Sequence, residues 1–230
     1  VYCTGYRHPA ILANAGATID HLSGGRLELG LGAGWHEVES RGYGFPLEAP
    51  AVRLRRLAEA VEVIRLLWTE PVASFRGEFF TLDDAMCNPK PLQESPRIWI
   101  GAQGDKLALP LVGRIADGWN IPYVAPEVFR HKLAIVREHA PNPDRIVTGV
   151  NVGLVFADGD PDEALRRRYG KGADHVKEGS LFGSVDQIVD KVGRYRDAGA
   201  DWINLGLRAP FDLLGLERFV TEVIPQTRGT

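Results

Sequence analysis

Two glycine-containing loops hold the residues whose types and spacing could do chemistry. The first contains Gly30, Gly32 and Gly34, and His36 lies two residues further on. A glycine-rich loop after a strand is also part of the dinucleotide-binding fingerprint. That fingerprint would need a third glycine at position 35, where a helix would begin. Trp35 stands there, so we discount nicotinamide binding. Two interpretations remain: the glycines let a ligand ring approach the backbone at the end of a strand, or they form a plain tight turn.

His36 also has two interpretations. It either faces a ligand from a strand end or lies on the surface of the following turn, and its spacing alone favours the surface. A zinc-protease motif would need a histidine at position 40, where Ser40 stands, and the other histidines show no ligand spacing. The sequence therefore predicts no metal site.

The second loop, residues 102–105, joins an apolar strand to a helix expected over residues 106–113. Free backbone N–H groups and the positive end of a helix favour a phosphate, and Gly104 permits close approach. Asp105 opposes this, because a carboxylate there can cap the helix itself and would repel a phosphate. Pro110 is expected to shorten or kink that helix. Phosphate binding and helix capping both stay open for this loop.

The cysteines and the arginine groups are assigned structural roles. Cys3 and Cys87 match no paired metal or redox spacing, so packing is favoured over a nucleophilic role. The arginines within residues 53–56 and 166–168 lie on expected helices with acidic residues nearby. This pattern indicates solvated helix faces rather than nucleic-acid patches.

The composition excludes several classes of protein. Of 230 residues, 44% are hydrophobic and 25% are charged, as in a globular domain and unlike a disordered or fibrous chain. The formal net charge of -3 gives no electrostatic footprint for nucleic acid or an anionic membrane. No run of about 18 apolar residues and no charged-then-apolar leader occurs, so we expect a cytoplasmic protein.

The elements that must position these loops alternate between strand and helix. Strands are expected over residues 1–6, 27–31, 97–101, 117–121, 146–157 and 202–207. Helices are expected over residues 10–22, 52–67, 106–113, 126–140, 184–199 and 213–224, and a further helix is expected to begin at residue 161. Residues 71–96 interrupt this order and are interpreted as an insertion with a short hairpin at best. About six strand–helix repeats favour a wound α/β architecture, either an open doubly wound sheet or a (β/α)₈ barrel.

Several strings in order resemble the luciferase-like monooxygenase superfamily, and within it the branch that uses the deazaflavin coenzyme F420. They are Arg7-His8-Pro9, AGATIDHLSGGRLELGLGAGWHEVE at 15–39, GYGFP at 42–46, NPKPLQ at 88–93, RIWIGAQG at 97–104 and ADGWN at 116–120. The resemblance implies one (β/α)₈ TIM-barrel domain over residues 1–230, with an insertion at about 71–96. It also implies a flavin-type ring at the carboxyl ends of the strands.

On this resemblance Val1–Tyr6 corresponds to the third barrel strand, so the first two β/α units are missing. A complete barrel takes about 250 residues, and the only methionine is Met86, so we expect a piece of a longer polypeptide. In the family the missing units carry much of the substrate pocket and a polar catalytic residue. A non-prolyl cis bulge behind the ring would fall before Val1. The catalytic residue therefore stays unassigned.

The resemblance carries over a cofactor site residue by residue. Leu31, Gly32 and His36 match the segment beside the ring, and Ala102, Gln103, Gly104, Asp105 and Ala108 match the segment that binds the coenzyme's phosphate. Relatives often have Gly-Pro where this chain has Asp105-Lys106, which weakens the phosphate assignment, although Lys106 offers compensating charge.

The leading expectation is an oxidoreductase that transfers a hydride between coenzyme F420 and a small organic substrate, with the cofactor carrying the redox chemistry. An FMN-dependent monooxygenase is the alternative within the same fold. A non-catalytic barrel remnant or interaction subunit is the alternative from another class. The expected partners are a small-molecule substrate and a second copy in a homodimer, with neither nucleic acid nor membrane.

Overall fold

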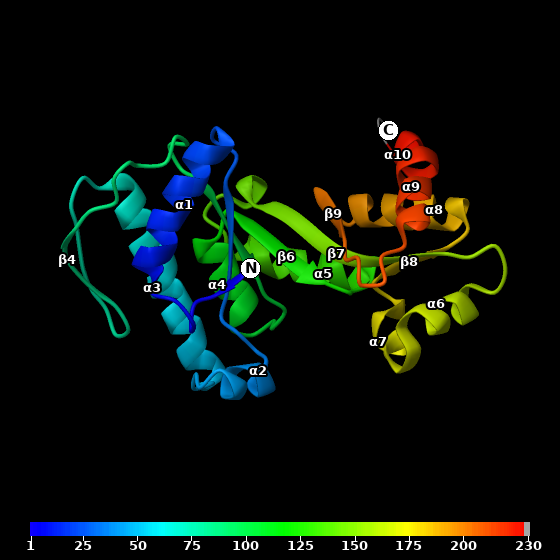
Figure 1. Ribbon diagram of the computed structural model, residues 1–230, viewed down its shortest axis with the longest axis horizontal. Coiled ribbons are helices and arrows are strands. Elements are labelled where there is room, and N and C mark those ends of the chain that lie inside the picture. Colours follow the sequence, from blue (N-terminus) through cyan, green and yellow to red (C-terminus); the bar gives the residue numbers. More distant parts are fainter. Residues whose placement is uncertain (228–230) are drawn as a thin grey trace. The chain divides into compact units, whose positions relative to one another are not determined.

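The computed structural model describes residues 1–227, and the chain divides into two compact units (Figure 1). The first unit holds Val1–Trp119 and Ile135–Ile146. The second holds Asn120–Ala134 and the chain from Val147 onward. Strand β6 (Gly118–Pro122) and helix α5 (Pro126–Glu138) each run from one unit into the other.

The first unit is built on three parallel strands. β1 (Tyr2–Cys3), β2 (Glu28–Gly32) and β5 (Arg97–Gly101) pair in that order. Its helices are α1 (Pro9–Ser23), α2 (Glu37–Gly42), α3 (Pro50–Thr69) and α4 (Ala108–Ile115), with a 3₁₀ turn at Pro143–Arg145. The parallel pairing follows from the helices between consecutive strands, because a crossover returns the chain in the same direction.

The two faces of this sheet differ in chemistry because side chains alternate along each strand. Leu29, Leu31, Ile98 and Ile100 lie on one face and are buried. On the other face, Glu28 pairs with Arg97 and with the indole N–H of Trp99. The core of the unit therefore lies on the leucine and isoleucine face, together with the buried stripe of α3 that includes Leu57, Val61 and Ile64.

Residues 71–96, which the sequence analysis interpreted as an insertion, contain an antiparallel hairpin of β3 (Ala73–Arg76) and β4 (Thr81–Ala85). Its turn is held by Glu59 of α3, whose carboxylate accepts the backbone N–H groups of Glu78, Phe79 and Phe80 at 2.7, 2.9 and 3.3 Å. The turn of the hairpin is thus attached to α3 through Glu59, and the Arg55–Glu78 pair adds a second contact at 2.8 Å.

The second unit has its own parallel strands. β7 (Val147–Phe156) pairs with β9 (Trp202–Leu205) through residues 149–152 and with β8 (Ser180–Gly183) through residues 153–156. The helices are α6 (Pro161–Tyr169), α7 (Ala173–Lys177), α8 (Val185–Asp197), α9 (Leu213–Arg218) and α10 (Ile224–Thr227), with a 3₁₀ turn at Gly170–Gly172 and a π-helical segment at Phe219–Val223. The predicted N-cap at Asp160 and the capping box of Ser184 and Gln187 are both confirmed.

Some predicted boundaries are wrong, for local reasons. The first strand covers only Tyr2–Cys3, and the last predicted helix is divided by the π-helical segment. α2, α7 and β8 were not predicted, since elements of four to six residues are too short to show a period. α4 begins two residues later than expected, which places Pro110 in the first helical turn, where its missing N–H costs nothing.

The remaining strands and long helices lie within a few residues of their predicted bounds, so the α/β class is confirmed. Within residues 1–227, no helix has the length and hydropathy needed to cross a membrane.

Candidate functional site

The carboxyl ends of β2 and β5 bring together the two loops that the sequence singled out. Leu31 pairs with Ile100, and a β carbon built on Gly32 would lie 4.0 Å from the carbonyl oxygen of Gly101. The two loops therefore leave the sheet side by side. Leu31 and Gly32 are both buried: the Leu31 side chain packs in the core, and Gly32 places no side chain at the strand end.

The glycines of β2 give room to the first residue of the chain. A β carbon on Gly30 or Gly32 would lie 3.3 or 3.2 Å from the side chain of Val1. Both contacts are tighter than usual, so close approach at these positions is real, although here the approaching group is Val1. The predicted approach of a ligand ring stays a prediction.

Gly34 is required by the turn after β2. Its φ of +78° lies in the left-handed region, and an added β carbon would lie 2.7 Å from Cys3 Sγ. The carbonyl of Gly34 accepts a hydrogen bond from the guanidinium of Arg53, whose Nε also donates to the Glu48 carbonyl at 2.9 Å. The tight-turn interpretation therefore accounts for Gly34.

The arginines of α3 correct one expectation. Arg55 is exposed as predicted, whereas Arg53 and Arg56 are partly buried and hold the loop after β2. Arg56 pairs with Glu48 at 2.7 Å. Glu48 and Gly34 both lie outside α3, so the periodicity of the helix could not indicate these contacts.

His36 is the N-cap of α2. Its Nδ1 accepts the backbone N–H of Glu39 at 3.0 Å, and the edge of its ring meets Trp35 at a centroid distance of 4.9 Å. The side chain is exposed, which agrees with the surface interpretation. Because Nδ1 accepts, neutral His36 carries its proton on Nε2, the atom that remains for a ligand. Its role toward a cofactor stays a prediction.

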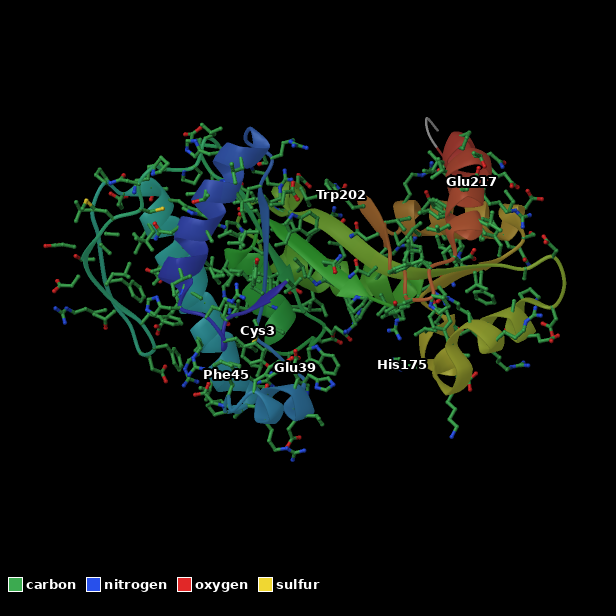
Figure 2. The ribbon with its side chains drawn as sticks, viewed as in Figure 1. Cys3, Glu39, Phe45, His175, Trp202 and Glu217 are labelled. Carbon is green, nitrogen blue, oxygen red and sulfur yellow. The ribbon has the colours of Figure 1, made fainter. Side chains whose placement is uncertain are left out.

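Contacts with Tyr6 fix α2 next to the turn that carries His36. The hydroxyl groups of Tyr6 and Ser40 share a hydrogen bond of 2.8 Å, and the Tyr6 ring lies 4.7 Å from that of Phe45. Figure 2 shows Cys3, Glu39 and Phe45 at this end of the first unit. The turn that carries His36 is thus held by packing as well as by Arg53.

The loop after β5 is anchored by a buried tryptophan that the sequence analysis did not assign to the site. Trp119 is fully buried, and its indole N–H donates to the carbonyl of Ala102 at 3.0 Å. The only sequence signal was its place in the ADGWN string. This bond fixes the start of the loop against β6.

The same loop presents backbone donors at the start of α4. The Gly104 carbonyl accepts the N–H groups of Ala108 and Leu109 at 3.1 and 3.0 Å. Within residues 1–227, the N–H groups of Gly104 and Lys106 donate no hydrogen bond. The N-cap is Leu107, whose side chain is apolar, so Asp105 is not the cap that one interpretation expected. Exposed donors at the positive end of a helix can hold an oxyanion.

Cys87 fits the packing role that the sequence favoured. Cys87 is buried, and burial raises the pKa of its thiol, an effect that the charge of Lys90 opposes only in part. Cys87 therefore stays protonated at neutral pH and is a poor nucleophile. No group of three His, Cys, Asp or Glu side chains that could hold a metal ion occurs in residues 1–227.

A family model described as luciferase-like monooxygenase matches residues 2–178. Among curated proteins, an uncharacterized protein of Mycobacterium tuberculosis is 39% identical over 111 residues, which cover 48% of this chain and 38% of that protein. The phthiodiolone/phenolphthiodiolone dimycocerosates ketoreductase of the same species is 28% identical over 97% of this chain and 72% of its own length. The chain thus spans well under half of the first relative.

Solved structures share the fold. An F420-dependent secondary alcohol dehydrogenase in complex with an F420-acetone adduct matches 100% of this chain and 78% of its own, with a TM-score of 0.84 and 24% identity. The long-chain alkane monooxygenase LadA matches 98% of this chain and 67% of its own, with a TM-score of 0.77 and 15% identity. These likenesses confirm the predicted fold class of luciferase-like TIM barrels.

Proposed function

Because the chain belongs to the luciferase-like monooxygenase family, we propose that it is an oxidoreductase that transfers a hydride between coenzyme F420 and a small organic substrate. The observation that carries this proposal is the TM-score of 0.84 over the whole chain to an F420-dependent secondary alcohol dehydrogenase. A tetrahydromethanopterin reductase of Methanopyrus kandleri that depends on the same coenzyme matches 97% of the chain with a TM-score of 0.78.

The loop after β5 fits the phosphate of such a coenzyme. Gly104 and Lys106 each offer a backbone N–H without a partner in residues 1–227, and a β carbon on Gly104 would meet only the Ala108 β carbon, at 3.7 Å. The carboxylate of Asp105 works against an anion, and the ammonium group of Lys106 offsets that charge. On balance, two backbone N–H groups without a hydrogen-bond partner in residues 1–227, with open space beside Gly104, favour a bound oxyanion.

In this proposal the coenzyme supplies the hydride chemistry when it is bound, and the chain binds and orients it. Ala102, Gln103, Gly104, Asp105 and Ala108 hold the phosphate, and Leu31, Gly32 and His36 lie beside the ring. Trp119 keeps the phosphate loop in place through the Ala102 carbonyl. Arg53 does the same for the turn of His36 through the Gly34 carbonyl.

The names of two similar proteins indicate the substrate class. One is a secondary alcohol dehydrogenase and the other a ketoreductase, so both names describe interconversion of an alcohol and a carbonyl. We therefore propose a ketone or secondary alcohol as the substrate.

Two other functions compete with this proposal. An FMN-dependent monooxygenase is supported by the likeness to the alkane monooxygenase. A non-catalytic remnant is supported by Asp105, which places a negative charge in the phosphate loop.

Titration of the protein with F420 and with FMN, followed by cofactor fluorescence, separates the three functions. We expect saturable binding of F420 and much weaker binding of FMN. Saturable FMN binding without F420 binding would instead establish the monooxygenase, and binding of neither cofactor would establish the remnant.

A further inference from the structure

Three connections in the second unit bring tyrosines and arginines together. Tyr123 follows β6 directly, Arg208 lies three residues after β9, and Tyr169 ends α6, the helix that follows β7. All three therefore belong to connections that leave the carboxyl ends of strands. In barrel enzymes such connections form the active site, and those after the last two strands frequently bind phosphate.

Glycines leave space for the two phenol groups. A β carbon on Gly153 of β7 would lie 2.4 Å from the Tyr169 hydroxyl and 2.6 Å from Ser180 Oγ. One on Gly206 would lie 2.9 Å from the Tyr123 hydroxyl. Real β carbons essentially never come this close, so any other residue at these positions would displace the hydroxyl groups.

The backbone of Tyr123 is held in an unusual conformation. Its φ is +53°, in the left-handed region that side chains other than glycine rarely adopt, and a β carbon on Gly179 would lie 2.1 Å from its carbonyl carbon. Non-glycine residues in this region cluster at ligand sites, where the surrounding structure holds them in place. The strain at Tyr123 thus coincides with the space left by the glycines.

Among the described residues, the two arginines of the cluster have no carboxylate partner. The guanidinium of Arg208 lies 5.8 Å from the centroid of the Tyr123 ring, and that of Arg168 donates to the Arg208 carbonyl. In the described part of the chain, neither guanidinium has a carboxylate within 4.0 Å. Three other cations of the unit have carboxylate partners, in the pairs Lys177–Asp162, Arg194–Glu127 and Arg218–Asp158.

Tyr169 donates its phenol proton to Ser180 Oγ, because the Ser180 hydroxyl itself donates to the Val176 carbonyl at 2.8 Å. Burial raises the pKa of its phenol, and the nearby Tyr123 raises it further, while Arg168, Arg208 and a hydrogen bond with Ser180 oppose the shift. The phenol therefore stays protonated at neutral pH. Two guanidinium groups without a carboxylate partner in residues 1–227, together with the Tyr123 phenol, form a set that suits an oxyanion.

From this cluster we infer an oxyanion-binding site, in which Arg208 and Arg168 supply charge and Tyr123 donates a hydrogen bond to a phosphate or carboxylate group. Its assignment to the substrate or to the side chain of the cofactor rests on the proposed function. The existence of the site does not rest on the proposed function, because the site is built entirely from residues of the second unit and includes neither of the two loops assigned to the cofactor.

Calorimetric titration with inorganic phosphate at constant ionic strength, with chloride as the reference anion, tests the site. We expect Arg208→Gln to weaken phosphate binding about tenfold, as loss of one charge-assisted hydrogen bond does. Tyr123→Phe keeps the ring under Arg208 and should weaken binding several-fold. The matched control is Arg167→Gln, which removes an exposed arginine of the same helix as Arg168 and should change nothing. Equal phosphate affinity in wild type and Arg208→Gln, or no binding beyond that of chloride, overturns the site.

Two further arms identify the source of the anion. If Arg208→Gln weakens F420 binding, the group belongs to the cofactor; if Arg208→Gln binds F420 as wild type does, it belongs to the substrate. Gly104→Leu should leave the Arg208-dependent phosphate binding intact, since it acts on the other loop. A protein that binds phosphate through Arg208 but binds no F420 retains this site and refutes the proposed function.

Discussion

At the scale of single residues, Asp20 joins three segments of the first unit. It is fully buried, and its carboxylate accepts hydrogen bonds from the backbone of Leu27 and from both the backbone and side-chain nitrogens of Gln93, at 3.1, 2.9 and 2.7 Å. Burial alone would raise the pKa of Asp20, but these hydrogen bonds together hold it below its usual value. The charged form is therefore the one that stabilises the fold.

Asp20→Asn should lower the free energy of unfolding by about 2 kcal/mol at pH 7, because the new amide group turns a donor toward the donors of Gln93. Since the folded-state pKa lies below the unfolded value of about 3.9, the contribution is present above that pH and is lost as pH falls through the folded-state pKa. Urea unfolding from pH 7 to pH 3 measures both effects. The exposed Asp83→Asn is the control, and an Asp20 variant with the pH profile of wild type would contradict this role.

Trp119 tests the phosphate loop at the same scale. Trp119→Phe removes the indole N–H that holds the Ala102 carbonyl, so we expect a loss of about 1 kcal/mol in stability and weaker F420 binding. Trp68→Phe removes a comparable bond, to the Ala13 carbonyl at 2.9 Å, and should cost similar stability without affecting the cofactor. Equal cofactor affinity in the two variants would remove Trp119 from the site.

At the scale of elements, the sequence predicted those parts whose information is local. α1 begins at Pro9 and ends before Gly24, whose φ of +66° suits a left-handed cap, and α8 begins at its capping box. α4 was misplaced because Pro110 was assigned to its interior. The contacts of Glu59, Arg53 and Trp119 could not be predicted, because each joins segments whose proximity only the fold determines.

The hairpin of β3 and β4 offers a test of one such contact. Glu59→Ala removes the acceptor of three backbone N–H groups, so we expect faster hydrogen exchange of Glu78, Phe79 and Phe80 and faster proteolysis at the turn, with the rest of the unit unchanged. Glu62→Ala, an exposed residue one turn away, is the control. Unchanged exchange at these three amides would show that the turn is held by other contacts, such as the Arg55–Glu78 pair.

At the scale of the whole molecule, the ordered strings that resembled a known family predicted both the family and the fold class, and the family match over residues 2–178 confirms them. No single string had that power, because each has an ordinary structural explanation; the Gly34 turn and the surface position of His36 show this. The assignments of residues to the cofactor site stay predictions, since each concerns a contact with a ligand, and a ligand is not part of the chain.

In the proposed function, the loop at residues 102–108 holds the phosphate of coenzyme F420. Fluorescence titration of F420 against wild type, Gly104→Ala and Gly104→Leu tests it most directly. A β carbon at position 104 makes only an ordinary contact with Ala108, so Gly104→Ala should bind F420 within a few-fold of wild type. The larger Gly104→Leu side chain should cover the donors and weaken binding by about a hundredfold or more while the circular dichroism spectrum stays that of wild type. F420 binding by Gly104→Leu with wild-type affinity would show that this loop does not hold the phosphate.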